Sequence, residues 1–346
     1  MAKEKEQSSD YSSEIKQLKE GGPGSLYLIH GRETYLCALF EKELKLRCVG
    51  EEDSFGYYRF DGVPELQELK NAVDTLPFLS ERTFVEVLNA DLSKLTDEQV
   101  ELLKDIPDYC TLVFLSPPDS EPDKRTKAYK LFSSAGRNLC FESQSPEKLY
   151  KWIDKRFSAL GKRITRPAAQ RLVLLSGEYM NGLIPEIEKL ASFTGKELVD
   201  VEEVNAVAHH LPEADAFELV NFISERRFNQ AISYLSELLA DKNTSSFAVL
   251  ASLGYLFRQL WAVKCALDAG LGTKEIMGLL GTNSEYRAKL TIGSSKKYSK
   301  ASVKNAVQLI ALSEFRAKSS GISEDEILKD CVVRLIAEEQ LAKTLS

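Results

Sequence analysis

The chain has 346 residues and a mass of 38.7 kDa, a length that predicts two or three domains with full hydrophobic cores. Hydrophobic residues make up 43% of the chain and charged residues 28%, which excludes a disordered or fibrous protein. Because 52 acidic residues outnumber 45 basic ones and the net charge is −7, the composition argues against a protein that binds nucleic acid on its own.

Cysteine usage and hydropathy favour a cytoplasmic protein. The spacing of the six cysteines is typical neither of zinc ligands nor of a disulfide framework, so we expect buried, reduced thiols at Cys37, Cys48, Cys110, Cys140, Cys265 and Cys331. No apolar run approaches the ~18–20 residues of a membrane span, and the first twenty residues lack the apolar core of an export signal. The predicted location is the cytoplasm, and no membrane partner is expected.

The first part of the chain predicts a polar tail and then an α/β domain. Residues 1–20 mix charges, and Gly21-Gly22-Pro23-Gly24 separates them from the first strand-like run, so we expect a tail there. Over residues 21–143, helical spacing alternates with short strand-like runs, which lie at 26–29, 54–60, 83–88, 111–115 and 138–141. This alternation predicts a mainly parallel sheet covered by helices.

After residue 143 the strand-like runs stop, and the rest of the chain is predicted to be helical. Ser145-Pro146 is typical of a helix start, and we expect a small helical domain over residues 144–210. Beyond it, four long patterns of apolar residues at helical spacing predict a helical bundle over residues 211–346. The predicted fold class is therefore α/β followed by all-α.

The residues that would bind a nucleotide or a metal are missing from the sequence. A phosphate-binding loop needs Gly-Lys-Ser/Thr after the first strand, whereas the chain has His30-Gly31-Arg32-Glu33-Thr34, with one glycine and an acidic residue. The adjacent His209 and His210 suit the negative end of a helix better than a metal. We expect no cofactor, no metal and no catalytic site of the chain's own.

One short segment is a candidate for docking to another protein. In Leu76-Pro77-Phe78-Leu79, large apolar side chains surround a proline where a predicted helix passes into the strand at 83–88. If these side chains are buried they form a hydrophobic plug, and the residues alone favour that interpretation. If they are exposed they form a docking site.

Several short motifs occur in order over residues 24–338. They are Leu28-Ile29-His30-Gly31 with Glu33 and Tyr35-Leu36, Phe60-Asp61-Gly62, Leu76-Pro77-Phe78-Leu79-Ser80-Glu81-Arg82, Asp123-Lys124-Arg125-Thr126-Lys127, Trp152-Ile153, Glu186-Ile187-Glu188-Lys189-Leu190 and Phe217-Glu218-Leu219-Val220. None is specific alone, but their order and spacing resemble the delta subunit of the bacterial replicative clamp loader, a part of the DNA polymerase III holoenzyme.

The resemblance implies an AAA+-like parallel α/β domain without a working nucleotide site, a helical lid domain, and a C-terminal helical collar. It implies that the collar assembles with loader subunits of the tau/gamma and delta-prime types. It further implies that the chain binds and opens the ring-shaped sliding clamp, the beta subunit, for loading onto primed DNA without hydrolysing ATP itself. The residues that enter the clamp fall on Phe78 and Leu79, with Leu76 and Pro77 shaping the corner. Nucleotidyltransferase activity belongs to the holoenzyme.

Two basic stretches contrast with the acidic average. Residues 151–171 carry seven basic residues beside a lone Asp154, and residues 285–304 carry six beside Glu285. Both fit solvated faces. Because tyrosines interrupt the second stretch, its alternative is contact with primer-template DNA in the assembled loader, through Arg287, Lys289, Lys296, Lys297, Tyr298 and Lys300.

Two other functions stay open at this point. One is an active AAA+ ATPase of a clamp loader or a repair complex, against which the missing Gly-Lys-Ser/Thr argues. The other is a helical interaction scaffold unrelated to replication. Titration with nucleotide distinguishes the active ATPase from the clamp-opening hypothesis. A measurement of binding to the sliding clamp distinguishes the helical scaffold from it.

Overall fold

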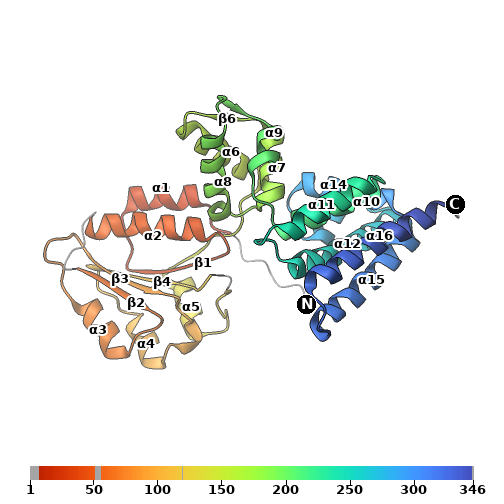
Figure 1. The fold of residues 1–346 in the computed structure, drawn as a ribbon. Helices are drawn as coiled ribbons and strands as arrows, with labels where there is room; N and C mark the ends of the chain where they lie inside the picture. The colour runs from red at the N-terminus through yellow and green to blue at the C-terminus, as the bar shows by residue number, and fades with distance from the viewer. Residues whose placement is uncertain (1–7, 51–55, 119, 345–346) are drawn as a thin grey trace. The chain divides into compact units, whose positions relative to one another are not determined.

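A computed structural model describes residues 8–50, 56–118 and 120–344 of the chain (Figure 1). The chain divides into two compact units. Unit 1 consists of residues 1–144 with 179–181, and unit 2 consists of residues 145–178 with 182–346. The three-part division at 21–143, 144–210 and 211–346 stays a prediction.

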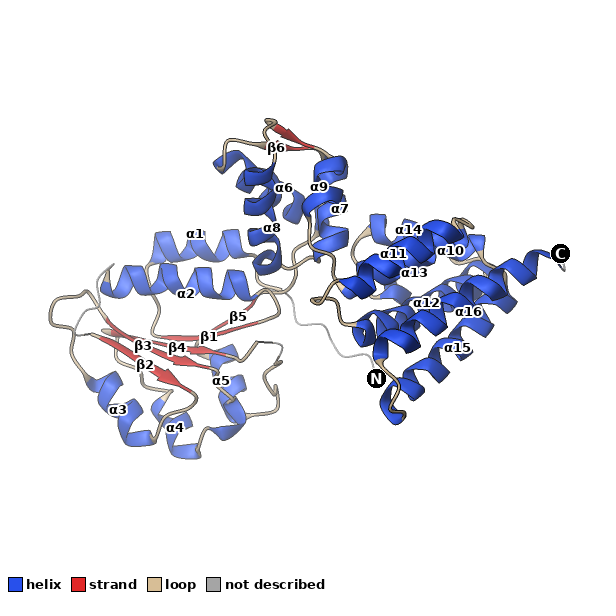
Figure 2. Cartoon of the chain, in the orientation of Figure 1, coloured by secondary structure: helices blue, strands red, loops and turns tan. Residues whose placement is uncertain are grey.

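Unit 1 is a parallel sheet between two layers of helices (Figures 1 and 2). Its strands are β1 (Leu26–His30), β2 (Tyr57–Asp61), β3 (Thr83–Leu88), β4 (Cys110–Leu115) and β5 (Arg137–Cys140). Its helices are α1 (Tyr11–Gly21), α2 (Thr34–Val49), α3 (Leu66–Asp74), the short 3-10 helix η1 (Leu92–Lys94), α4 (Asp97–Leu102) and α5 (Lys127–Ser134). The strand order is β2-β3-β4-β1-β5, and every neighbouring pair is parallel. The predicted parallel α/β class is confirmed.

The central strands of the sheet are covered on both faces, by α1 and α2 on one side and by α3, α4 and α5 on the other (Figure 1). Strands β1, β3 and β4 are buried along almost their whole length, which explains why most of their residues are apolar. Phe114 of β4 packs against Phe132 of α5, with ring centroids 5.3 Å apart.

The predicted polar tail is wrong for its second half, because residues 11–21 form helix α1. The Asp10 side chain caps the helix by accepting a hydrogen bond from the Ser13 amide, and Leu18 is fully buried. Before the helix, the Ser9 amide donates to the Cys140 carbonyl at 2.7 Å, beside the edge strand β5. Contacts with the sheet thus stabilise a segment that its composition alone would leave unfolded. Residues 1–7 lie outside the described residues.

The first half of unit 2 is a small helical group. It contains α6 (Pro146–Ala159), α7 (Arg166–Ser176), all but the first two residues of α8 (Met180–Phe193), α9 (Val201–Val207) and a two-stranded parallel sheet of β6 (Arg163–Ile164) and β7 (Leu198–Val199). The predicted helix start at Ser145-Pro146 is confirmed, since the Ser145 hydroxyl accepts a hydrogen bond from the Lys148 amide and Pro146 opens α6.

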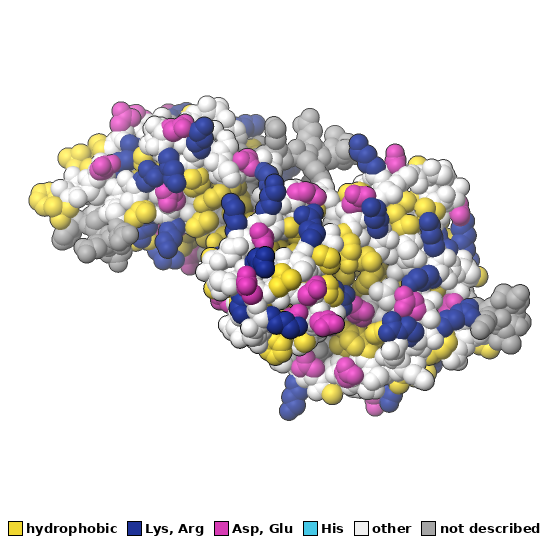
Figure 3. All heavy atoms as spheres, turned by 90° about the horizontal axis from the view of Figure 1, so that it is seen from above, with side chains coloured by type: hydrophobic (Ala, Val, Ile, Leu, Met, Phe, Trp, Pro, Cys, Tyr) yellow, Lys and Arg dark blue, Asp and Glu magenta, His cyan; other side chains and the backbone are white. Residues whose placement is uncertain are grey.

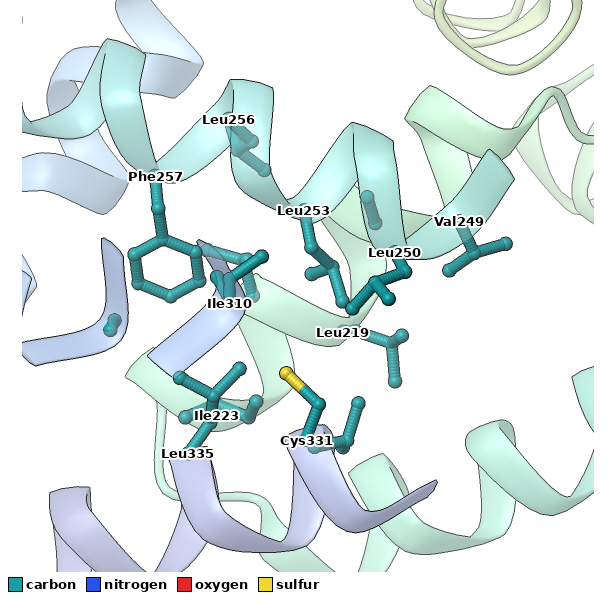
Figure 4. Packing of buried hydrophobic residues seen from close by; sticks show 14 of the residues in the cluster. Leu219, Ile223, Val249, Leu250, Leu253, Leu256, Phe257, Ile310, Cys331 and Leu335 are labelled. Carbon is teal, nitrogen blue, oxygen red and sulfur yellow. The ribbon is translucent and has the colours of Figure 1, made fainter. Parts of the chain in front are cut away.

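The second half of unit 2 is a bundle of helices, which confirms the all-α class predicted for this part. The helices are α10 (Pro212–Ser224), α11 (Phe228–Ala240), α12 (Ser246–Asp268), α13 (Thr273–Leu280), α14 (Glu285–Lys297), α15 (Lys300–Ser319) and α16 (Glu324–Thr344). Figure 4 shows the core, in which Leu253 and Phe257 of α12 lie among Ile223 of α10, Ile310 of α15 and Leu335 of α16.

The expectation that no segment is long and apolar enough to cross a membrane is corrected at α12. Among the described residues, this is the one helix whose length and composition would allow a span. Its apolar residues Leu250, Leu253, Phe257 and Leu260 are buried in the bundle instead. The position of α12 at the centre of the core accounts for its composition.

Candidate functional site

The loop of residues 75–82, between α3 and β3, exposes three large apolar side chains. Leu76 is 67% exposed, Phe78 83% and Leu79 74%, while Pro77 is half-buried. The hydrophobic-plug interpretation is therefore wrong for these three residues. Figure 3 shows hydrophobic side chains projecting at its left end, the end at which Figure 1 draws unit 1. Such a protruding apolar group is typical of a surface that binds another protein.

The start of this loop is fixed by the end of helix α3. Thr75 leaves the helix with extended backbone angles, as expected for a segment that leads into Pro77. Its hydroxyl donates to the Asn71 carbonyl at 2.7 Å and accepts from the Tyr58 hydroxyl at 3.2 Å. The first residue of the loop is thereby bound to α3 and to β2.

The end of the loop is fixed by strand β3. The Thr83 amide donates to the Tyr109 carbonyl at 2.8 Å, and the Phe84 amide donates to the Gly56 carbonyl at 2.8 Å. The buried Thr83 hydroxyl donates to the Thr75 carbonyl at 2.6 Å, which joins the two ends of the loop. The exposed side chains thus lie on a short loop whose base is closed.

The turn after β1, where a nucleotide-binding protein would hold phosphate, is filled by the chain itself. A Cβ atom at Gly31 would lie 2.2 Å from the Phe141 carbonyl oxygen, so backbone occupies the space beside this turn. The Glu33 amide donates to that same carbonyl at 2.9 Å. The Glu33 side chain is fully buried and accepts a hydrogen bond from the Met180 amide at 3.2 Å. A buried carboxylate at this place opposes the binding of phosphate.

The basic stretch at 285–304 lies on α14 and the start of α15, and most of its candidate residues have a partner within unit 2. Lys289 pairs with Glu285 at 2.7 Å, Lys297 with Glu225 at 2.7 Å, and Lys300 with Asp268. Arg287 and Lys296 are exposed, and no ion pair joins either of them to a described residue. The local positive charge is therefore smaller than the sequence suggests.

Tyr298 must be removed from the candidates for stacking on DNA bases. It is 4% exposed, its hydroxyl donates to the Val220 carbonyl at 3.0 Å, and its ring packs against Phe257 with centroids 5.6 Å apart. Helix α14 ends at Lys297, and the extended backbone of Tyr298 turns its side chain into the bundle core. Tyr298 is a core residue.

The comparisons with known proteins concern both halves of the chain. The family described as DNA polymerase III, delta subunit, matches residues 27–141, and its C-terminal domain matches residues 213–335. The chain belongs to the DNA polymerase III delta subunit family. This membership makes it a clamp-loader subunit of DNA replication, as the order of its motifs predicts.

Relatives cover nearly the whole of this delta-family chain. It is 23% identical to DNA polymerase III subunit delta of Bacillus subtilis, over 94% of this chain and 96% of the relative. It is 21% identical to the probable DNA polymerase III subunit delta of Aquifex aeolicus, over 92% and 93%. The solved structure of the Bacillus subtilis DNA clamp loader delta protein has a TM-score of 0.60 at 22% identity, over 95% of this chain and 100% of that one, and shows the same fold.

The basic stretch at 151–171 has structural partners. The Arg166 guanidinium lies 4.2 Å from the centre of the Tyr150 ring, and that of Arg156 lies 5.4 Å from the centre of the Trp152 ring. Arg171 pairs with Glu218 of α10 at 2.6 Å. The contacts of Arg166 and Arg171 link α7 to α6 and to α10, and that of Arg156 lies within α6.

The histidines and cysteines have structural surroundings. His210 lies 3.2 Å from Asp215 and 3.1 Å from the Tyr234 hydroxyl, and the His209 amide donates to Glu186 at 2.8 Å. Among the described residues, no three His, Cys, Asp or Glu side chains group so as to hold a metal ion. The prediction of buried thiols is confirmed for five cysteines and wrong for Cys265, which is exposed.

Sequence reasoning missed two groups of residues in unit 1. One is Arg82, whose side chain binds the base of the exposed loop. The other joins Tyr57, Glu86 and Glu41, since the Tyr57 hydroxyl donates to Glu86 at 2.5 Å and Glu86 lies beside Glu41. The one sequence signal for the group of Tyr57, Glu86 and Glu41 was Glu86 itself, a charged residue inside the otherwise largely apolar strand Thr83–Leu88.

Proposed function

We propose that this delta-family chain binds and opens the ring-shaped sliding clamp, so that the clamp can be loaded onto primed DNA. Phe78 and Leu79 enter a pocket of the clamp, and Leu76 and Pro77 shape the corner beside them. The observation that carries the proposal is the high exposure of these apolar side chains on a loop closed at its base. A few apolar side chains that fill a pocket commonly supply most of the affinity of an interface.

We also propose that the chain does not hydrolyse ATP. Support comes from the turn after β1, where the Phe141 backbone and the buried Glu33 carboxylate take the place that phosphates need. The turn also lacks the Gly-Lys-Ser/Thr sequence of a phosphate-binding loop. Energy for loading would then come from other subunits of the assembly.

Residues 211–346 are proposed to assemble with loader subunits of the tau/gamma and delta-prime types in the cytoplasm. Support comes from apolar side chains that the bundle leaves exposed, among them Leu312 and Phe315, one helical turn apart on α15. Contact with primer-template DNA is proposed for α14 and the start of α15, through Arg287, Lys289, Lys296, Lys297 and Lys300.

The test of clamp binding is the double change Phe78→Ala with Leu79→Ala in the full chain. Truncation of such an anchor costs ~2–4 kcal/mol, so affinity for the sliding clamp should fall by about thirty- to a thousand-fold. The melting temperature should not change, since both side chains are exposed. Affinity is measured by titration calorimetry and melting by circular dichroism.

The matched control is Leu312→Ala with Phe315→Ala, which removes two similarly exposed apolar side chains from unit 2. This variant should bind the clamp as the parent does. If the Phe78 and Leu79 variant still binds the clamp with parental affinity, the loop is not the clamp-binding site and the proposal fails.

A further inference from the structure

Arg82 connects the exposed loop to three other segments of unit 1. Its Nε donates to the Thr111 hydroxyl at 2.9 Å, and one terminal nitrogen donates to the Cys110 carbonyl at 3.0 Å and to the Ser25 hydroxyl at 3.4 Å. Its backbone amide donates to the Cys48 carbonyl at 3.2 Å. One residue thus binds the loop to α2, β4 and the segment before β1.

The acceptors of the Arg82 side chain are themselves held in place. Thr111 is fully buried in β4, and its hydroxyl donates to the Gly24 carbonyl at 2.9 Å. Cys110 is buried and begins the same strand. The planar guanidinium, with donors in a fixed fork, therefore meets two acceptors whose positions are set by the sheet. This geometry fixes the direction in which the chain enters β3.

Few other hydrogen bonds hold the part of the loop that precedes Arg82. The Ser80 hydroxyl donates to the Arg82 carbonyl at 2.9 Å, so Ser80 depends on the position of Arg82. The backbone of residues 76–79 forms no hydrogen bond with any described residue. The orientation of Phe78 and Leu79 is consequently set from the base of the loop, at Thr75 on one side and at Arg82 on the other.

We infer that Arg82 is a positioning residue for clamp binding, which holds Phe78 and Leu79 in the arrangement that docks. This inference rests on the proposed function. Without the guanidinium of Arg82, the loop samples other conformations. The apparent affinity for the sliding clamp then falls in proportion to the fraction of molecules whose loop is competent to dock. If that fraction drops to about one-tenth, affinity falls about tenfold.

The experiment compares Arg82→Ala and Arg82→Lys with the parent chain, and uses Arg47→Ala as a control. Arg47 pairs with Glu43 one turn away on its own helix, and no hydrogen bond or ion pair joins its side chain to the loop of residues 75–82. Clamp affinity, melting temperature and amide hydrogen exchange of residues 82 and 83, whose amides donate to the Cys48 and Tyr109 carbonyls, are measured on each variant. The affinity is referred to the folded fraction, so that a loss of stability does not count as a loss of binding.

We expect Arg82→Ala to bind the clamp about tenfold more weakly and to exchange the amides of residues 82 and 83, at the base of the loop, faster. Arg82→Lys, which keeps the charge but reaches one acceptor at a time, should fall between Arg82→Ala and the parent. Arg47→Ala should match the parent in both measurements. If exchange of residues 82 and 83 and clamp affinity stay at the parental values in both Arg82 variants, the inference is wrong.

The two proposals fail in different ways. If the Phe78 and Leu79 double variant loses clamp binding and Arg82→Ala does not, clamp binding by the loop stands and the positioning role is overturned. If the double variant keeps clamp binding, the proposed docking site fails, and the positioning role fails with it. The exchange measurement needs no clamp and reports on the base of the loop in either outcome.

Discussion

The hydroxyl of Thr83 donates a 2.6 Å hydrogen bond to the carbonyl of Thr75, and so closes the loop that presents Phe78 and Leu79. Thr83 is fully buried at the start of β3, whereas Thr75 is the residue at which α3 ends. A helix, an exposed apolar loop and a central strand are thus joined at one point. The loop is part of the folded unit rather than an appendage.

Thr83→Val is predicted to destabilise unit 1. Valine keeps the shape of the side chain but leaves the Thr75 carbonyl without this donor, and the loss of such a hydrogen bond costs about 1 kcal/mol. For a unit of this size, the melting temperature should fall by about 2–4 °C. Scanning calorimetry of the full chain checks the result, with the exposed Thr273→Val in unit 2 as control. An unchanged melting temperature would show that the closure adds nothing to stability.

The carboxyl group of Glu41 is predicted to make the stability of unit 1 depend on pH. Burial raises the pKa of Glu41, and the hydrogen bond and negative charge of Glu86 raise that pKa further, from 4.5 to about 8, against the opposing charges of Lys45 and Arg59. Between these pH values, the folded chain keeps a proton that the unfolded chain has lost. The free energy of unfolding should therefore fall as pH rises from 4.5 to about 8.

Glu41→Gln tests this pH dependence. Glutamine stays neutral at every pH. The free energy of unfolding of Glu41→Gln should therefore fall much less with rising pH than that of the parent, and the variant should be more stable than the parent near pH 8. Urea unfolding is measured at intervals across the range, and Glu43→Gln, on the same helix but paired with Arg47 at 3.0 Å, serves as the control. If the free energy of unfolding of Glu41→Gln falls with pH as steeply as that of the parent, a group other than Glu41 causes the pH dependence.

The strands of unit 1 could be predicted because their buried runs are continuous in the sequence, as in Leu26–His30 and Cys110–Leu115. Helix α1 could not be, because its partners lie far along the chain: Arg137 binds Glu14 across 123 positions. Its mixed charges describe its exposed face, and they conceal the single buried Leu18.

The candidate site shows the same limit. Pro77, Phe78 and Leu79 could be singled out by type, but the exposure of Phe78 and Leu79 depends on contacts at Thr75, Arg82 and Thr83 that no local pattern encodes. The prediction for Tyr298 is wrong for the opposite reason. Its neighbours Lys296 and Lys297 are exposed, and the end of α14 at Lys297 turns the next side chain inward.

Titration of the chain with Mg-ATP is predicted to show no binding. The Glu33 carboxylate is buried within the turn that would receive phosphate, and the Phe141 carbonyl lies against Gly31. The buried acidic side chain and the occupied space both oppose a nucleotide. Isothermal titration checks the outcome. Micromolar binding that disappears when residues of the turn are changed would favour the alternative of an active ATPase.

The basic stretch is predicted to act on DNA through its unpaired charges rather than through Tyr298. Lys296 is exposed with no ion pair to a described residue, whereas Lys297 pairs with Glu225 at 2.7 Å. If the end of α14 faces primer-template DNA in the assembled loader, Lys296→Glu should weaken DNA binding. It should also lower the slope of log affinity against log salt concentration by about one unit.

Tyr298→Phe separates the core role of Tyr298 from a role in DNA binding. Removing its hydroxyl takes away the 3.0 Å hydrogen bond to the Val220 carbonyl, so unit 2 should lose about 1 kcal/mol of stability. The DNA affinity of the assembled loader should stay unchanged, because the ring is buried against Phe257. Filter binding at several salt concentrations compares this variant with Lys296→Glu. Weaker DNA binding by a loader that contains a stable Tyr298→Phe chain would contradict the assignment of Tyr298 to the core. DNA binding at the parental level by Lys296→Glu would mean that the basic stretch at 285–304 is a solvated face.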